Sequence, residues 1–320
     1  MDYLLGIDVG STTVKLALTD SSTGEVCFHR YRRHGARQRE VAAELLLELE
    51  KDMPGVEVRP VFTGSGGGDL ARRCGIGHVQ EVVANSVAVQ RFHPRTRVAI
   101  ELGGQDAKVI FFHADPVSGE LHTSDMRMNG SCAGGTGAFI DEIAKLLRTP
   151  IEEFNDLASA GSMVYQISGR CGVFAKTDIQ PLLNQGVDRS NLALSTFHAI
   201  ARQTIGGLAQ GLRITPPVIF QGGPLTFNPV LISVFAELLA LQDDQIIIPA
   251  NPEIFVAHGA ALSLSTIFPE TEPATPGDLS ERLRKMTAEP DGAGSADNEP
   301  DVFFSNDDER RAFENRHRRP

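Results

Sequence analysis

The sequence predicts an α/β protein made of two similar domains. Alternating apolar runs are followed by stretches rich in alanine, leucine and glutamate, and a strand pair with a glycine turn occurs twice. The first pattern is typical of half-buried strands and the second of helices. With 320 residues, 41% of them hydrophobic, the chain is long enough to bury two separate cores.

The first part of the chain contains four predicted strands and two predicted helices. Apolar runs bounded by Gly, Asp or Ser indicate the strands, and an Ala-, Leu- and Glu-rich run that ends before Pro54 and Gly55 indicates the first helix. The expected strands cover residues 3–9, 14–19, 26–31 and 59–63, and the expected helices cover residues 39–51 and 81–92.

The first strand pair recurs later in the chain. GIDVGSTTVK at residues 6–15 aligns without a gap with AIELGGQDAK at residues 99–108. The alignment matches Ile7 with Ile100, Asp8 with Glu101, Gly10 with Gly103, and Lys15 with Lys108. Residue type, spacing and the expected hairpin all agree, so we interpret the repeat as a duplicated three-strand unit. Two similar domains that face each other would follow.

The charge of the chain argues against two classes of partner. A formal net charge of -11 repels phosphates, which excludes a general binder of nucleic acid or of anionic membranes. No basic stretch followed by an apolar one stands at the N-terminus, and no apolar run reaches the roughly 18 residues of a membrane helix. The sequence therefore predicts a cytoplasmic protein with reduced thiols.

Each copy of the repeat carries a glycine turn between two strands. Such a turn can direct backbone N–H groups and hydroxyls at a phosphate, while the acidic residue at the strand end holds a metal ion through water. A plain hairpin turn is the alternative. The first turn offers Asp8, Gly10, Ser11, Thr12, Thr13 and Lys15, and the second offers Glu101, Gly103, Gly104, Gln105 and Asp106. For Lys15 and Lys108 we favour solvated strand ends over contacts with phosphate.

Two further glycine sites occur late in the chain. The apolar run 218–221 leads into Gly222 and Gly223, and a helix is expected from about Pro229. Paired glycines after a strand let a backbone approach a nucleotide closely. Gly259 lies in a helix start of small residues that would pack tightly under a cleft. Close packing alone is the alternative for both sites.

The order of these motifs resembles the superfamily of actin, sugar kinases and heat-shock chaperone ATPases. The resemblance covers nearly all of residues 1–268 and implies ATP and Mg²⁺ in a cleft between two ribonuclease-H-like domains. We expect the first domain to comprise residues 1–93 plus about 245–268, and the second to comprise residues 94–244. The acidic, proline-rich residues 269–320 are expected to be a flexible linker or the start of a further segment.

Two of the four cysteines stand just before predicted helices. Cys132 precedes a helix expected over residues 138–147, and Cys171 precedes one expected from about Lys176. Helix N-termini stabilise thiolates, and a 4Fe-4S cluster with four thiolates is an anion. A symmetric dimer could hold one cluster with both cysteines of each chain. The alternative is that they are small buried hydrophobes. We interpret Cys27 and Cys74 as structural, because no partner spacing suggests otherwise.

Five segments carry a closer resemblance, namely NGSCAGGTGAFIDEIAKLL, SGRCGVFAKTDIQPLLNQG, IDVGSTTVK, GGQDAK and QGGPLTFNP. They resemble the activator family of 2-hydroxyacyl-CoA dehydratases and benzoyl-CoA reductases, the BadF/BadG/BcrA/BcrD type. The resemblance implies a homodimer bridged by one 4Fe-4S cluster, which uses ATP to pass a single electron to a dehydratase or reductase partner. A reduced ferredoxin or flavodoxin would be the donor.

The resemblance also implies roles for individual residues. Cys132 and Cys171 become the cluster ligands, and Asp8, Glu101, Gln105 and Asp106 serve phosphate, Mg²⁺ and water. The remaining cofactor-binding candidates are Gly10, Ser11, Thr12, Thr13, Lys15, Gly103, Gly104, Gly134, Gly135, Gly222 and Gly223.

The chain departs from the shorter activators at two places. They tend to have Asp where Glu101 stands, and a different tripeptide where this chain has Pro224-Leu225-Thr226. These features are more similar to the amino-terminal module of large activase-type proteins.

Two other classes of function remain open. The first is a small-molecule kinase of the same superfamily with buried cysteines, although no long polar insertion between residues 15 and 99 offers a substrate site. The second is a nucleotide-sensing or reactivating ATPase without a cluster. Iron content separates both from an electron-transfer activator.

Overall fold

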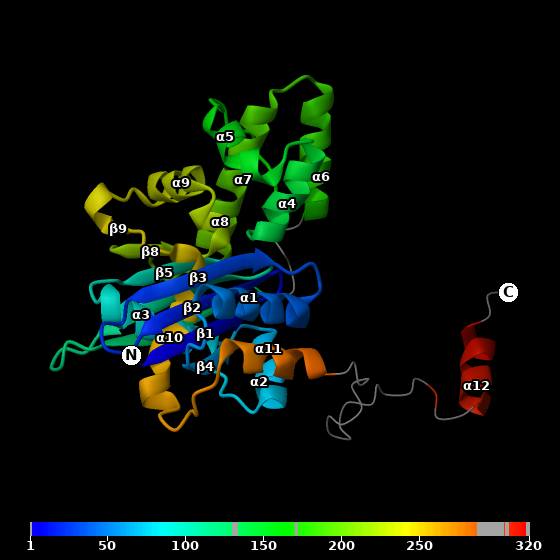
Figure 1. The fold of residues 1–320 in the computed structure, drawn as a ribbon. Helices are drawn as coiled ribbons and strands as arrows, with labels where there is room; N and C mark the ends of the chain where they lie inside the picture. The colour runs from blue at the N-terminus through cyan, green and yellow to red at the C-terminus, as the bar shows by residue number, and fades with distance from the viewer. Residues whose placement is uncertain (1, 130–133, 170–171, 287–303, 305–306, 318–320) are drawn as a thin grey trace. The chain divides into compact units, whose positions relative to one another are not determined.

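The computed structural model describes residues 2–129, 134–169, 172–286, 304 and 307–317 (Figure 1). The chain divides into two units, Met1–Lys285 and Met286–Pro320. The second unit contains helix α12 (Asp307–His317). Among the described residues, no helix combines the length and apolar character that crossing a membrane requires.

The first unit contains two β-sheets (Figure 1). The first has four strands in the order β3-β2-β1-β4, where β1 pairs antiparallel with β2 and parallel with β4. The second has five strands in the order β7-β6-β5-β8-β9, where β5 pairs antiparallel with β6 and parallel with β8. The strands of the first sheet are β1 (Tyr3–Val9), β2 (Thr13–Asp20), β3 (Val26–Arg33) and β4 (Val58–Thr63). Those of the second are β5 (Val98–Leu102), β6 (Ala107–Ala114), β7 (Leu121–Met128), β8 (Val218–Gln221) and β9 (Ile246–Ile247).

The two sheets share one design, which confirms the predicted duplication. Each begins with a three-strand antiparallel meander, to which a later strand is added in parallel beside the first. The registers also match, because Asp8 pairs with Lys15 as Glu101 pairs with Lys108. The duplicated positions of the sequence therefore occupy equivalent places in the two sheets.

Two helices lie between the sheets. Helix α10 (Phe255–Ile267) packs on β1, β2 and β4 and against helix α3 (Glu81–Phe92), whose Ala88 and Val89 join the core formed with β5, β6 and β8. The two helices approach so closely at Gly259 that a Cβ there would lie 1.9 Å from the Ala84 carbonyl oxygen. The predicted close packing of the small residues around Gly259 is thus confirmed, and its partner is α3.

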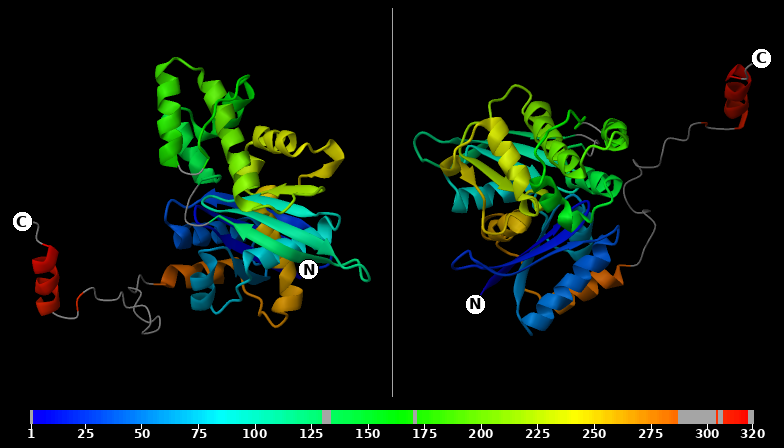
Figure 2. Two further views of the ribbon diagram at one scale, coloured as in Figure 1. Left: turned by 180° about the vertical axis from the view of Figure 1, so that it is seen from behind. Right: turned by 90° about the horizontal axis from the view of Figure 1, so that it is seen from above.

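The outer face of each sheet carries its own helices (Figure 2). Helices α1 (Gln38–Asp52) and α2 (Gly67–Cys74) cover the first sheet, and α11 (Pro276–Lys285) packs on both. A large apolar cluster joins β5, β6 and β8 to helices of the segment 137–239. These helices are α4 (Gly137–Leu146), α5 (Phe154–Ser159), α6 (Gly172–Asn184), α7 (Arg189–Gln203), α8 (Gly223–Thr226) and α9 (Pro229–Leu239). Short 3₁₀ turns are η1 (Ile151–Glu153), η3 (Asp243–Gln245) and η4 (Pro252–Ile254), and η2 (Thr204–Leu208) is a π-helix.

Part of the segment that the composition assigns to a linker is folded onto the first sheet. Ala274 pairs with Val58 of β4, and Leu279 and Leu283 of α11 are buried. Ser280 also donates a hydrogen bond to the Ala43 carbonyl at 2.9 Å. The first unit therefore continues to Lys285, beyond the expected end of the ATPase region at about residue 268.

Candidate functional site

Two hairpin loops with the same hydrogen bond stand at the ends of β1 and β5. The Gly10 N–H donates to the Thr13 carbonyl at 2.9 Å, and the Gly103 N–H donates to the Asp106 carbonyl at 2.8 Å. We call residues 8–15 hairpin 1 and residues 101–108 hairpin 2. A Cβ on Gly104 would lie 1.9 Å from the Thr12 hydroxyl oxygen, so the tips of the two hairpins touch.

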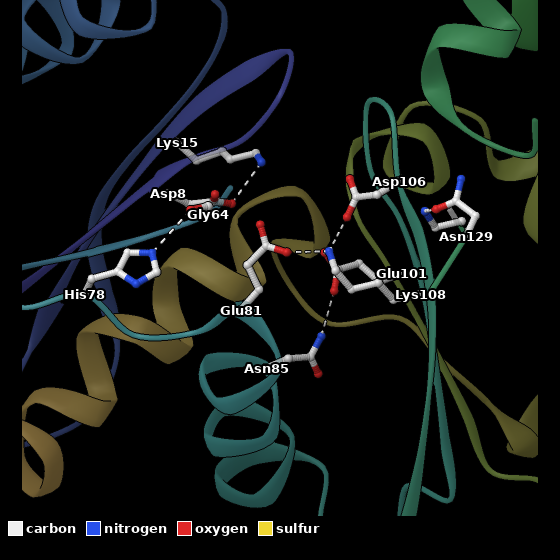
Figure 3. A network of polar contacts seen from close by, with 11 residues as sticks. Asp8, Lys15, Gly64, His78, Glu81, Asn85, Glu101, Asp106, Lys108 and Asn129 are labelled. Carbon is white, nitrogen blue, oxygen red and sulfur yellow. Dashed lines mark hydrogen bonds and ion pairs between the residues drawn. The ribbon is translucent and has the colours of Figure 1, made fainter. Parts of the chain in front are cut away.

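Both acidic residues face the layer between the sheets. Side chains alternate along a strand, so Asp8 shares its face of β1 with Gly6, which lies against Ala257 of α10. Glu101 likewise shares its face of β5 with Ala99, which packs in the core with α3. Strand periodicity therefore directs the two carboxylates to the same interior region (Figure 3).

Each carboxylate pairs with the lysine opposite it. Lys15 Nζ lies 2.9 Å from Asp8 Oδ2, and Lys108 Nζ lies 3.3 Å from Glu101 Oε1 (Figure 3). The side chain of Lys15 is 15% exposed and that of Lys108 is 4% exposed. The prediction that these lysines are solvated strand ends is wrong, because an acid across the strand pair offsets the cost of burying each ammonium group.

Lys108 gathers two further acids. It forms ion pairs with Glu81 at the start of α3, at 2.5 Å, and with Asp106 of its own hairpin. Asn85, one turn further along α3, donates to Glu101 at 3.1 Å and accepts from Gln221 of β8 at 3.1 Å. This buried polar network joins the inner helix α3 to hairpin 2 and to β8.

Sequence reasoning missed three members of this network, namely Glu81, Asn85 and Gln221. Glu81 was expected only as the start of a helix, and Gln221 only as the end of a strand. No short-range spacing links them to hairpin 2, since α3 and β8 reach it through the tertiary fold. The duplication did offer one signal, because the matched acid and lysine positions placed a charge pair in each copy.

The ionisation of the network follows from burial and from neighbouring charges. Burial lowers the pKa of Lys15, but the charge of Asp8 and its hydrogen bond outweigh this and raise that pKa. Burial also lowers the pKa of Lys108, but the carboxylates of Glu101, Glu81 and Asp106 raise it well above its usual value. Burial raises the pKa of Glu101, although Lys108 opposes the shift. Both lysines are therefore cations at neutral pH.

The charge of the site suits a divalent cation. Asp8, Glu81, Glu101 and Asp106 bring four carboxylates, against the two ammonium groups of Lys15 and Lys108. Asp8 Oδ1 is buried and has no hydrogen-bond partner among the described residues. Within the described ranges no three His, Cys, Asp or Glu side chains converge as direct metal ligands. The residues thus fit Mg²⁺ held through water and ligand oxygens, as this ion prefers.

Gly64 shapes the site behind Asp8. Its backbone has φ 92°, and a Cβ there would lie 2.4 Å from Asp8 Oδ1. The His78 ring holds the Gly64 carbonyl through Nε2 at 3.3 Å (Figure 3). Only glycine fits this close approach to the Asp8 carboxylate.

A cavity of about 320 Å³ extends from the hairpin tips. Thr12 and Gly104 line one end, and Gly223, Pro224 and Phe227 line another part. A smaller cavity of about 30 Å³ joins Asp8, Glu101 and Gly222. The larger volume lies in the range of small-molecule sites, at roughly 300 to 1,000 Å³.

Gly222 and Gly223 stand at positions that leave no space for a side chain. Gly222 has φ 95°, and a Cβ there would lie 2.1 Å from the Leu102 carbonyl oxygen. A Cβ on Gly223 would lie 2.3 Å from the Tyr31 hydroxyl oxygen. The pair therefore lets β8 and its following turn approach both β5 and the first sheet, beside the cavity.

The structure does not bring every predicted residue to these cavities. Gln105 is exposed in the turn of hairpin 2 and lines neither cavity, and Ser11 also lies outside both linings. Gly134 and Gly135 are buried, and Gly135 packs near Gln203 and Thr204 rather than in the cavity, which Gly137 lines instead. The predicted cluster ligands Cys132 and Cys171 lie outside the described residues.

Hairpin 2 is bonded on both sides of the stretch that contains Cys132. Before it, Asn129 Oδ1 accepts from the Ala107 N–H at 2.7 Å and the Asn129 N–H donates back at 3.1 Å. After it, the N–H groups of Gly137 and Ala138 donate to the carbonyls of Gly103 and Gly104 at 3.0 and 2.7 Å. The chain thus enters and leaves residues 130–136 through contacts with hairpin 2.

The helices that follow the two cysteines in the sequence lie side by side. Glu142 of α4 and Lys176 of α6 form an ion pair at 3.5 Å, and the two helices are in contact. Both residues lie in the first two turns of their helices. Helices α4 and α6 are therefore neighbours (Figure 1).

Known proteins are similar to this chain in sequence. The BadF/BadG/BcrA/BcrD ATPase family matches residues 5–263. The activator of lactoyl-CoA dehydratase from Anaerotignum propionicum is 28% identical over 264 residues, which are 81% of this chain and 96% of that protein. The (R)-2-hydroxyglutaryl-CoA dehydratase activating ATPase of Acidaminococcus fermentans is 29% identical over 228 residues, which are 69% and 82% of the two chains.

The fold is shared as well. The crystal structure of (R)-2-hydroxyglutaryl-CoA dehydratase component A from Acidaminococcus fermentans superposes with a TM-score of 0.69 and 27% identity, over 82% of this chain and 97% of that one. The predicted fold class, two ribonuclease-H-like domains of the actin, sugar kinase and chaperone ATPase superfamily, is confirmed. The predicted resemblance to the dehydratase activators is confirmed with it.

Proposed function

We propose that this chain, which belongs to the BadF/BadG/BcrA/BcrD ATPase family, is an ATP-dependent activator that delivers single electrons to an acyl-CoA dehydratase or related reductase. Two of its relatives are named as activators of such dehydratases. The electron would come from a reduced ferredoxin or flavodoxin, which loses one electron, and would pass on to the partner enzyme, which gains it.

The proposal places Mg-ATP between the two hairpins. Thr12 and Gly104 bring the hairpin tips to the larger cavity, and Gly223 lies beside it, where a nucleotide base and ribose would fit. Asp8, whose Oδ1 has no hydrogen-bond partner among the described residues, would hold Mg²⁺ through water. Lys15 and Lys108 hold Asp8 and Glu101 in place through ion pairs. The division into residues 1–93 plus about 245–268 and residues 94–244 is part of this proposal.

The proposal assigns a 4Fe-4S cluster to Cys132 and Cys171 of two copies of the chain. Such a cluster, when bound, supplies one-electron redox chemistry. The contact between α4 and α6 supports this, because these are the helices that follow the two cysteines in the sequence. Two helix N-termini would also favour the negative charge of thiolate ligands.

One observation carries the coupling of ATP to electron transfer. The residues on both sides of the Cys132 stretch, Asn129 and Gly137, are hydrogen-bonded to hairpin 2. A displacement of hairpin 2 by the nucleotide would therefore move both ends of that stretch together. Because α4 begins at this contact, the change would extend to the helix start beside the proposed cluster.

The test is the iron and sulfide content of the protein purified without oxygen. We expect roughly four irons for every two chains. Cys132→Ala and Cys171→Ala should each abolish this content. Cys27→Ala and Cys74→Ala are matched controls that should keep it, since Cys27 is an exposed free thiol and burial raises the pKa of the Cys74 thiol to about 11.

A colourless protein that binds ATP after reconstitution with iron and sulfide would contradict the electron-transfer proposal. It would favour the small-molecule kinase or the nucleotide-sensing ATPase instead. Loss of iron in the Cys27 or Cys74 variant, with retention in the Cys132 variant, would place the cluster elsewhere.

A further inference from the structure

The turn that follows β3 is bonded to hairpin 1. His34, the first residue after this strand, is 3% exposed. Its backbone N–H donates to the Thr12 carbonyl at 3.0 Å, and its ring Nε2 lies 3.1 Å from the Gly10 carbonyl oxygen. His34 thus contacts two carbonyl oxygens of the hairpin turn, one through its backbone and one through its ring.

The partners of the His34 ring determine its tautomer. The Ala36 N–H donates to Nδ1 at 3.1 Å, so Nδ1 carries no proton. A carbonyl oxygen can only accept, so Nε2 carries the proton and donates to Gly10. Ala36 adopts φ 64°, a conformation that is unfavourable for a residue with a side chain. The hydrogen bond to Nδ1 holds this turn and keeps the ring directed at Gly10.

Fixing a carbonyl also fixes the amide beside it. A trans peptide unit is planar, and its C=O and N–H groups point in opposite directions. When the Gly10 and Thr12 carbonyls are bound on the His34 side, the N–H groups of Ser11 and Thr13 point away from His34. Two N–H groups on the side away from His34 can hold an anionic oxygen, and Thr12 and Thr13 of this turn line the two cavities.

We infer that His34 is a positioning residue for nucleotide phosphate, which it serves by holding the turn of hairpin 1 through the neutral Nε2–H tautomer. The inference rests on the proposed function, because it assumes that the cavity binds a nucleotide. It predicts that His34 contributes to the affinity for the phosphates and not to the affinity for the nucleoside.

Two substitutions separate the two hydrogen bonds of the ring. In His34→Asn, the side-chain oxygen can still accept from the Ala36 N–H as an Asx turn, but the donor to Gly10 is lost. In His34→Gln, the amide nitrogen is as many bonds from the backbone as Nε2 and can restore that donor. Calorimetric titration with adenosine and with the Mg²⁺ complex of a non-hydrolysable ATP analogue compares the two.

We expect His34→Asn to weaken binding of the ATP analogue about tenfold, the effect of losing one hydrogen bond, and to leave adenosine binding unchanged. His34→Gln should recover most of the loss. His258→Asn is the matched control: the His258 Nε2 bonds the Gly24 carbonyl at 2.9 Å, at the far end of β2 from hairpin 1. It should leave both affinities unchanged.

An ATP-analogue affinity in His34→Asn equal to that of the unsubstituted protein would overturn the inference, and so would equal losses for adenosine and the analogue. If His34→Asn alone does not fold, Ala36→Gly relieves the left-handed backbone and provides a more stable background for the same comparison. An unsubstituted protein that binds neither ligand would contradict the proposed function itself, and the two failures are thereby distinguished.

Discussion

Hairpin 1 and hairpin 2 share a backbone turn and a charge pair but differ in their surroundings. In hairpin 1, Lys15 pairs with Asp8, and one oxygen of that carboxylate is left without a partner among the described residues. In hairpin 2, Lys108 is shared among Glu81, Glu101 and Asp106. Among the described residues, hairpin 1 thus has a carboxylate oxygen without a hydrogen-bond partner, whereas the acids of hairpin 2 share one lysine.

The difference extends to the chain around each hairpin. The turn of hairpin 1 is bonded to His34, which directly follows β3 of the same sheet. Hairpin 2 is bonded to Asn129 and to the start of α4, which belong to the segment around Cys132. We infer that hairpin 1 holds ligand and metal, and that hairpin 2 transmits their presence to the cysteine segment. Four predictions test this contrast.

The largest expected effect is on the buried lysine of hairpin 2. Lys108→Met leaves Glu101 buried beside two other acids without a cation, and we expect it to lower the free energy of unfolding by about 3 to 5 kcal/mol. Lys15→Met is the matched variant and should cost less, about 1 to 3 kcal/mol, because only Asp8 loses its partner. Urea denaturation measures both. Equal losses would contradict the contrast between the hairpins.

The second prediction concerns Mg²⁺. Asp8→Asn removes the carboxylate whose Oδ1 is unpartnered, and we expect the affinity for Mg-ATP to fall about 10- to 100-fold while adenosine binding stays the same. Asp106→Asn in hairpin 2 should cost less, because that carboxylate is already paired with Lys108. A larger loss from the hairpin 2 variant would reverse the roles that we assign.

The third prediction is a pH dependence that originates in hairpin 2. Because burial raises the pKa of Glu101, this carboxyl group takes up a proton at a higher pH than an exposed glutamate. Protonation removes a negative charge near the cation, so the affinity for Mg²⁺ should decrease as the pH falls through that raised pKa. Glu101→Gln should abolish this step. The same pH profile in both proteins would exclude Glu101 as its source.

The smallest effect is expected at the edge of the larger cavity. Arg33 of β3 pairs with Asp141 of α4 at 2.6 Å, but its side chain is 56% exposed. Arg33→Ala should therefore change the free energy of unfolding by about 0.5 kcal/mol at most, and added salt should remove the difference. Arg72→Ala, which breaks another exposed pair with Asp69, provides the comparison. A salt-independent loss would show that Arg33 supports the site by more than its charge.

The sequence was sufficient to predict what depends on local pattern and duplication. The strand over residues 3–9 and the helix over residues 81–92 have the predicted bounds, since alternation and punctuation are local signals. The hairpin turns at Gly10 and Gly103 followed from the repeat. The acid and lysine positions of each hairpin were visible for the same reason.

What the sequence could not supply are contacts made by tertiary packing. From the sequence alone, Lys15 and Lys108 resemble solvated strand ends. They are buried because other parts of the fold cover the layer between the sheets. Asn85 meets Glu101 only because α3 lies against β5, and His34 meets Gly10 only because β3 returns to the first turn. Such contacts join residues whose spacing carries no periodic signal.

The central claim is that hairpin 2 links nucleotide binding to the Cys132 segment. The most direct test is the reduction potential of the protein reconstituted with iron and sulfide. It is measured with and without the Mg²⁺ complex of a non-hydrolysable ATP analogue. If hairpin 2 links the nucleotide to the Cys132 segment, the potential shifts when the analogue binds, and Asn129→Ala reduces the shift without abolishing nucleotide binding. The same potential in both states, with the analogue bound, would contradict the account.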